Sequence, residues 1–189
     1  YGYSLAVEGI VSFNSALPLD TTILKYFQDE QYYGSRIQAM EYVNGDIYVL
    51  SSYMYLGMNY PGNFFRISTA DWSIISKKAI EGELRPTDMT YDYSTNTMYA
   101  VQTYTTGPAA LCTFDLQTGQ ITKVTDINEQ IMAIACRNTG ILYGITPTGA
   151  LYTIDKKTGA TTLIGQTGLT LPVTSQSMAF DHNTGRLFL

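Results

Sequence analysis

A stretch that occurs twice, forty residues apart, constrains the fold of this chain more than any other feature. ALCTFDLQTGQITKVT (residues 110–125) and ALYTIDKKTGATTLIG (150–165) keep Leu, Thr, Asp, Thr and Gly in register. Residues before the Asp alternate with period 2, as in a β-strand. In the Asp-x-x-Thr-Gly segment the carboxylate accepts bonds from turn amides, and Gly supplies a positive φ. A second alternating run follows, so each copy predicts a β-hairpin.

A second type of hairpin recurs along the whole chain and ends in an aromatic residue. Its final aromatics are separated by 51, 44 and 45 residues. The copies are AMEYVNGDIY (39–48), DMTYDYSTNTMY (88–99), MAIACRNTGILY (132–143) and SMAFDHNTGRLF (177–188). A repeat of about 45 to 50 residues that holds two hairpins is typical of a propeller blade. The sequence therefore predicts an all-β fold, a β-propeller of four-stranded antiparallel blades.

The repeats divide the chain into about four blade-equivalents within a single domain, 1–189. Three units are complete and two are halves, and their approximate bounds are 1–27 (half), 37–80, 86–127, 131–168 and 175–189 (half). The first half resembles the third and fourth strands of a blade, and the last half resembles the first and second. The two complementary halves could form one shared blade and close a four-bladed ring. In the alternative, which we favour because larger rings are commoner, the chain is an excerpt of a six- to eight-bladed propeller.

Composition narrows the possible partners and the location. Charged residues make up only 14% of the chain and the net charge is −5, which argues against binding to nucleic acid. No apolar run is long enough for a transmembrane helix, so attachment to a surface would need residues outside this chain. Abundant Tyr, Thr and Asn favour a secreted, periplasmic or cell-surface protein. Cys112 and Cys136 are too few for a disulfide scaffold or a zinc site.

Propeller geometry places the loops on two opposite faces. The turn face carries the short turns between strands 1 and 2 and between strands 3 and 4 of each blade. The connection face carries the longer 2–3 and 4–1 connections. Aromatic and basic residues gather in the latter, and we predict a ligand-binding site of Tyr32, Tyr33, Arg36, Tyr53, Tyr55, Tyr60, Arg85 and Tyr104. Tyr combines an apolar ring with a hydroxyl, which suits a glycan or a protein partner. The alternative is that these tyrosines only fill gaps in loops and between blades.

No catalytic residue, cofactor or metal ligand is predicted. The only histidine, His182, lies in a turn, where we expect it to be solvated. One His can build neither a His-dependent triad nor a multi-histidine metal centre. The aspartates of the turns each bring one carboxylate, whereas calcium needs several converging oxygens, so we expect them to cap turns. They are Asp92, Asp115, Asp155 and Asp181.

The segments LYTIDKKTGATTLIG and FDHNTGRLF resemble bacterial secreted propellers with seven or eight blades, related to YVTN and quinoprotein-like repeats. The resemblance extends over nearly the whole chain and implies the fold, because turn residues carry it. The tryptophan docking motifs of quinoproteins are not present, and Trp72 occupies the Gly position of a 3–4 turn. The resemblance therefore implies no cofactor.

Three functions are compatible with these features. The leading hypothesis is a noncatalytic extracellular or periplasmic propeller that binds a glycan or a protein through its tyrosine-rich connection face. The second is a metal-dependent enzyme of the lactonase or lyase type, with a site in the central channel. Glu83, Asp88 and Glu129 fall near that channel, but nothing in the sequence defines their separation. The third is a structural array of blades within a larger surface protein.

Overall fold

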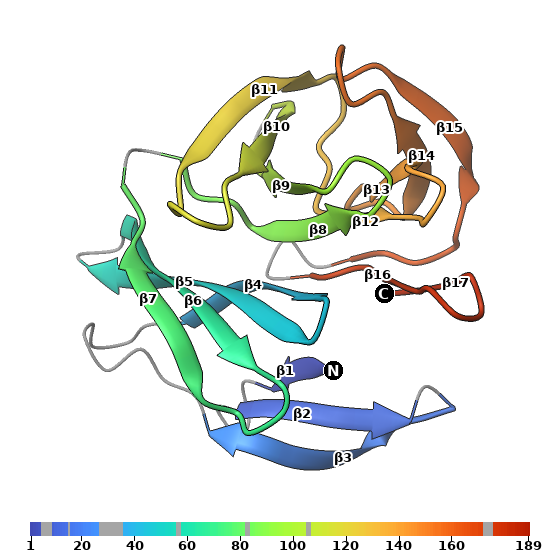
Figure 1. Ribbon diagram of the computed structural model, residues 1–189. Coiled ribbons are helices and arrows are strands. Elements are labelled where there is room, and N and C mark those ends of the chain that lie inside the picture. Colours follow the sequence, from blue (N-terminus) through green and yellow to red (C-terminus); the bar gives the residue numbers. More distant parts are fainter. Residues whose placement is uncertain are drawn as a thin grey trace. The chain divides into compact units, whose positions relative to one another are not determined.

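The computed structural model describes residues 1–4, 9–14, 16–26, 36–55, 58–81, 84–104, 107–171 and 176–189. Every regular element in these ranges is a β-strand, and each sheet is an antiparallel meander (Figure 1). The prediction of an all-β propeller fold is thus confirmed. The chain forms two compact units, Tyr1–Ile80 and Glu81–Leu189, which are described separately.

The first unit contains a three-stranded and a four-stranded sheet. The three-stranded sheet has the order β1-β2-β3, with bounds Gly2–Ser4, Gly9–Asn14 and Leu17–Tyr26. The other has the order β4-β5-β6-β7, with bounds Arg36–Val43, Asp46–Tyr55, Met58–Ser68 and Ile74–Ala79. Ile10 of β2 packs with Ile47 and Val49 of β5 and Phe65 and Ile67 of β6, so a buried apolar cluster joins the two sheets.

The second unit contains two four-stranded sheets and a two-stranded sheet. The first comprises β8 (Asp88–Asp92), β9 (Thr97–Gln102), β10 (Ala109–Phe114) and β11 (Ile121–Ile127). The second comprises β12 (Ala133–Cys136), β13 (Leu142–Ile145), β14 (Ala150–Ile154) and β15 (Thr161–Gln166). Strands β16 (Ala179–Asp181) and β17 (Arg186–Phe188) form the third.

The apolar run MAIAC (132–136) contains strand β12, whose side chains are buried on both faces of the sheet. Ile134 and Cys136 point into a cluster shared with Leu111 of β10. Ala133 and Ala135 point the other way and pack with Met178, just before β16. Buried side chains of this size each stabilise the fold by roughly 1–3 kcal/mol. Stacking of successive sheets, rather than any one sheet, therefore builds the core.

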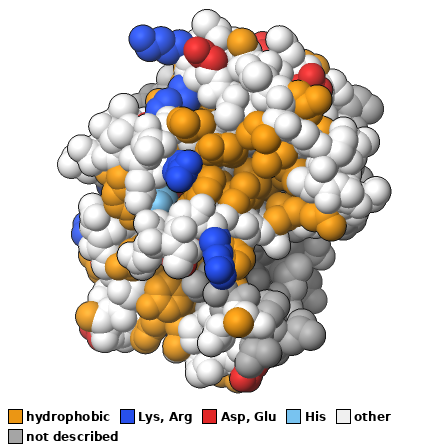
Figure 2. All heavy atoms as spheres, turned by 90° about the vertical axis from the view of Figure 1, so that its right-hand side faces the viewer, with side chains coloured by type: hydrophobic (Ala, Val, Ile, Leu, Met, Phe, Trp, Pro, Cys, Tyr) orange, Lys and Arg blue, Asp and Glu red, His pale blue; other side chains and the backbone are white. Residues whose placement is uncertain are grey.

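The repeat also shows where this stacking is less complete. Leu111 is fully buried, whereas Leu151, its counterpart in the repeat, is only partly buried. The two leucines have different neighbours: Leu111 packs in the cluster that contains Ile134 of β12, whereas Leu151 packs beside the cluster that contains Met178. Figure 2 looks onto the side where β15 and β17 lie in Figure 1, and shows hydrophobic side chains gathered there.

The Asp-x-x-Thr-Gly turns have the predicted capping geometry. Asp155 Oδ1 accepts hydrogen bonds from the backbone N–H groups of Lys157 and Thr158, both at 2.8 Å. Asp115 Oδ1 accepts the equivalent bonds from Gln117 and Thr118 at 2.8 and 2.7 Å. Gly159 closes its turn with a φ of 72°. The carboxylates of these two turns therefore cap backbone amides.

Trp72 departs from this pattern, because a bulky residue occupies the left-handed position that Gly takes in the other 3–4 turns. Its φ is 59°, and its N–H donates to Ser68 O at 3.0 Å. An L-residue in this conformation costs about 1–2 kcal/mol. The indole offsets that cost by packing against the cluster around Ile10 and edge-on against Tyr1, with ring centroids 5.6 Å apart.

Two glycines provide a test of how tightly the turns pack. Gly159 and Gly168 both have positive φ, but a Cβ at Gly159 would overlap the carbonyl of Asp126, whereas one at Gly168 would meet nothing within 4 Å. Gly168→Ala should lower the free energy of unfolding by about 1 kcal/mol. Gly159→Ala should lower it by about 2–4 kcal/mol, because steric overlap adds to the backbone strain. Denaturant titrations followed by circular dichroism measure both, and equal losses would contradict the close packing of this turn.

Candidate recognition site

The connection face of the second unit brings two predicted site residues to the same end of one sheet. Arg85 precedes β8 and Tyr104 follows β9, and these strands are antiparallel, with Asp88 opposite Val101. The backbone N–H of Arg85 donates to Gln102 Oε1 at 2.9 Å. Arg85 and Tyr104 therefore belong to one continuous rim of this unit.

The backbone around Tyr104 is held by the next 4–1 connection. Gln130 Nε2 donates to Tyr104 O at 2.8 Å, and the hydroxyl of Thr103 donates to Ile131 O at 2.5 Å. Thr87 extends the network through a hydroxyl contact of 3.0 Å with Thr103. The side chain of Tyr104 is 40% exposed. A fixed backbone thus presents a solvent-accessible aromatic ring.

The other predicted site residues belong to the first unit. Tyr32 and Tyr33 lie outside the described residues. Arg36, Tyr53, Tyr55 and Tyr60 lie in strands of the first unit whose backbone is described, but the placement of their side chains is not.

The segment SSYMYLGMNYPGN (51–63) differs from the expected loop. Strand β5 continues to Tyr55 and β6 begins at Met58, with Tyr53 opposite Tyr60. The register shifts between Leu50 and Ser52, and the Ser51 hydroxyl accepts from Asn63 N at 2.8 Å. Aromatic side chains favour strands, so the hairpin extends beyond the body of the sheet. The signal was visible in the sequence, but a bulge interrupts the alternation.

Asp88, one of the carboxylates that the sequence predicts near the channel, is fully buried. Its Oδ2 accepts from the N–H of Ile134 at 2.9 Å and its Oδ1 from the Ser177 hydroxyl at 3.1 Å. Burial raises the pKa of Asp88 to about 7, although hydrogen bonds from Ile134, Ser177, Met89 and Met178 oppose this shift. The side chain connects three successive repeats, which is a structural role.

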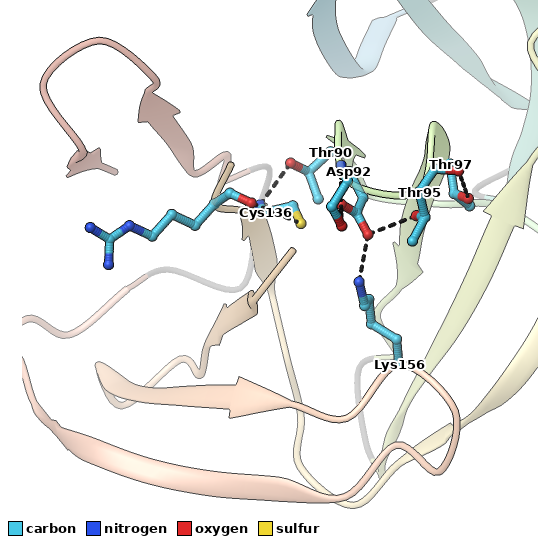
Figure 3. A network of polar contacts seen from close by, with 8 residues as sticks. Thr90, Asp92, Thr95, Thr97, Cys136 and Lys156 are labelled. Carbon is cyan, nitrogen blue, oxygen red and sulfur yellow. Dashed lines mark hydrogen bonds and ion pairs between the residues drawn. The ribbon is translucent and has the colours of Figure 1, made fainter. Parts of the chain in front are cut away.

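A second buried aspartate, Asp92, is paired with a lysine of the following sheet (Figure 3). Lys156 Nζ lies 2.5 Å from Asp92 Oδ2 and 5.5 Å from the centre of the Tyr99 ring. The hydroxyls of Ser94 and Thr95 donate to the same carboxylate at 2.7 and 2.8 Å. Burial raises the pKa of Asp92, but the hydrogen bonds from Lys156, Ser94 and Thr95 together lower it by more. The pKa of Asp92 therefore lies well below its usual range.

His182 differs from the expectation of a solvated turn residue. Its ring packs edge-on against Tyr93, with centroids 5.1 Å apart, and its side chain is half-buried. Nδ1 is shielded from solvent and has no hydrogen-bond partner among the described residues. Burial lowers the pKa of His182, and the nearby Asp181 only partly offsets this shift. The imidazole is therefore neutral at pH 7.

Other chemical features of the described ranges are structural. They contain no group of three or more His, Cys, Asp or Glu that could hold a metal ion. Cys112 and Cys136 are buried free thiols, and burial raises the pKa of Cys112 to about 11. Within the same ranges, no helix has the length and hydrophobicity needed to cross a membrane.

Comparisons with known proteins support the fold and leave the function open. No protein-family model matches the chain, and neither does any curated protein sequence. Among solved structures, a protein of unknown function from Bacteroides thetaiotaomicron aligns over 80% of this chain and 37% of its own, with a TM-score of 0.57 and 15% identity. A gluconolactonase from Xanthomonas campestris aligns over 96% of this chain and 61% of its own, with a TM-score of 0.57 and 14% identity.

A third match is the hydrazine synthase of Kuenenia stuttgartiensis, with a TM-score of 0.50, 11% identity, and coverage of 88% of this chain and 44% of that one. The chain thus spans less than two thirds of the length of each of these three structures. Structural matches at such low sequence identity show a shared fold and do not show a shared activity. Together with the four-stranded meander sheets, the matches define the class: this chain has a β-propeller-type fold.

The pair of Asp92 and Lys156 predicts a loss of stability in acid. Because the folded pKa of Asp92 lies below the unfolded value of about 3.9, its contribution is present above pH 4 and is lost as pH falls. Asp92→Asn should lower the free energy of unfolding by about 2–4 kcal/mol at pH 7, since it leaves Lys156 unpaired. The difference from wild type should shrink progressively as the pH falls below 4 and be smallest at the acid end of the range. Denaturation curves between pH 2 and pH 7 measure it, with the exposed cap variant Asp115→Asn as the control that loses less.

For Asp88 we expect the opposite dependence: the free energy of unfolding should fall as the pH rises. Its folded pKa lies above the unfolded value, so its stabilising contribution is complete below pH 4 and is lost as pH rises towards 7. Asp88→Asn cannot ionise and should lack this decline, which we expect to be about 2–4 kcal/mol between pH 4 and pH 8. The same denaturation curves measure it. A wild type that gained stability relative to Asp88→Asn over this interval would show that the hydrogen bonds outweigh burial.

Proposed function

We propose that this chain is a noncatalytic recognition module that binds a glycan through its connection face, in an extracellular or periplasmic setting. The observation that carries the proposal is Tyr104, an exposed ring on a backbone held by Gln130 and Thr103. A pre-ordered backbone reduces the entropy that is lost when a ligand binds.

The chemistry around Tyr104 favours a hydroxyl-rich ligand. Tyr offers a flat apolar ring for the C–H face of a sugar and a hydroxyl that can donate or accept. Gln102 and Thr103 add amide and hydroxyl groups to the same rim. Few charges are available in the whole chain, at 14% of residues. The other predicted residues, Tyr32, Tyr33, Arg36, Tyr53, Tyr55 and Tyr60, belong to the first unit and stay a prediction for that unit.

The enzyme alternative receives less support. The gluconolactonase match is one of fold, at 14% identity. A channel metal site would need carboxylate oxygens that are free to bind a cation. Both oxygens of Asp88 accept hydrogen bonds from protein groups of neighbouring repeats. We therefore assign Asp88 to the assembly of the repeats and place recognition at the rim.

Glycan arrays with matched variants test the proposal. Tyr104→Ala should weaken binding of a glycan hit by at least about tenfold, because ring stacking is lost. Tyr104→Phe should retain most of the affinity, since it keeps the ring. Tyr42→Ala is the matched control, because Tyr42 is 45% exposed but adjoins the turn between β4 and β5.

Two results would contradict the proposal. An array without hits would argue against glycan recognition and would favour a protein partner. An increase in the melting temperature with Ca²⁺ or Mn²⁺ would favour the metal-dependent alternative, because a ligand that binds only the folded state raises its stability.

A further inference from the structure

The turn face of the second unit contains a hollow that the proposed function does not use. Its volume is about 310 Å³, and it lies between the turn at residues 137–139 and the hairpin at residues 180–185. Ligand pockets in proteins begin at about 300 Å³, so it has room for one monosaccharide. All of its lining belongs to the second unit.

The hollow contains one cation, Arg137, that forms no ion pair within the described ranges. Arg137 is exposed, and its guanidinium has no ion pair or hydrogen bond within the described ranges. The carboxylate in the lining, Asp181, accepts hydrogen bonds within its own turn. Its Oδ1 accepts from Asn183 N at 2.9 Å and its Oδ2 accepts from the Thr184 hydroxyl at 2.6 Å. Asp181 is therefore engaged by its own turn, and the Arg137 guanidinium is available to an anionic group.

The preceding junction between repeats also contains a cation, but at a different position of the repeat. There Lys156, in the turn between β14 and β15, pairs with Asp92, whereas Arg137 aligns with Tyr93. Cys136 takes the place of Asp92 in the next repeat, so no carboxylate stands at the corresponding position beside Arg137. The turns also come closer at the earlier junction, where a Cβ at Gly140 would overlap Ser94 Oγ. The charge and the space thus occur together at the later junction.

The walls of the hollow are held in place before any ligand arrives. Asn138 Nδ2 donates to His182 O at 3.1 Å, which connects the two turns. Gly185 N donates to Asp181 O at 2.7 Å and closes the second turn. A Cβ at Gly185 would lie 3.7 Å from Arg137 Nη2, so the guanidinium faces this turn.

The remaining lining suits a sugar better than a bare anion. Thr139 and Asn183 are exposed and bring hydroxyl and amide groups to the hollow. Phe180 and His182 supply aromatic walls, and the pKa of His182 is lowered by burial, so the imidazole adds no second charge at pH 7. A guanidinium fork matches a carboxylate with two parallel hydrogen bonds.

We propose that this hollow binds a sugar that carries a carboxylate, a uronate unit, with Arg137 as the anchor of the carboxylate. The site is separate from the connection face and does not depend on the function proposed for it. Its ligand differs in charge as well, since Arg137 selects an acidic sugar.

The test is a titration of the full chain with galacturonate and glucuronate, followed by amide NMR. We expect shifts at Asn138, Thr139, Asn183 and Thr184, with a dissociation constant on the order of 1 mM. Galactose and glucose should bind at least about tenfold more weakly, because they lack the carboxylate. Signals around Tyr104 should stay unchanged, which separates this site from the connection face.

Variants then identify the anchor. Arg137→Gln should weaken uronate binding at least about tenfold, and Arg137→Lys should give an intermediate loss, because it keeps the charge without the fork. Lys157→Gln removes one exposed charge outside the hollow and should change affinity less than about twofold. An equal loss for Lys157→Gln and Arg137→Gln would overturn the proposal. So would equal binding of neutral and acidic sugars, or an absence of shifts at about 50 mM uronate, far above the expected constant.

Discussion

The second unit depends on hydrogen bonds that join the first strands of successive sheets. Strand β12 is an edge strand of its sheet, and its outward N–H groups need partners. Asp88 and Thr90, two residues apart on β8, accept from the N–H groups of Ile134 and Cys136, each at 2.9 Å. Because these acceptors are side chains, the sheets can stack face to face without merging into one sheet. The apolar cluster between them then excludes water from the same bonds.

The repeated turns share one backbone geometry, but the side chains beside them differ from one repeat to the next. Asp115 and Asp155 cap their own backbone amides in the same way. Asp92 does so as well, but it also binds Lys156 of the next repeat. At the following junction Cys136 stands where that carboxylate would be. A fold built from repeats can therefore place a paired cation at one junction and an unpaired one at the next, with little change to the backbone.

The two faces of the second unit present different chemical groups. On the connection face, uncharged hydrogen bonds from Gln130, Thr103 and Gln102 hold the backbone and leave the Tyr104 ring exposed. On the turn face, Arg137 brings a guanidinium without an ion pair in the described ranges to a defined hollow. Tyr104 and Arg137 both lie outside the regular strands, on backbone that the stacked sheets hold in place, where loop residues can vary at little cost to the core.

Local signals in the sequence determined the strand pairs and the turns. The spacing of Asp and Gly in each hairpin depends only on neighbouring residues, and the final aromatics show the length of the repeat. The exposure of Tyr104 fits its position in a predicted connection. Tertiary structure decided the rest, because the partners are distant in sequence: Asp88 and Ser177 are 89 residues apart, and Asp92 and Lys156 are 64 apart. Residues 51–63 contain the aromatic residues that favour strands, but the extended hairpin was not predicted, because a bulge at Ser51 breaks the alternation. Whether a charged side chain is paired depends on which repeat packs beside it, and that is a property of the folded chain alone.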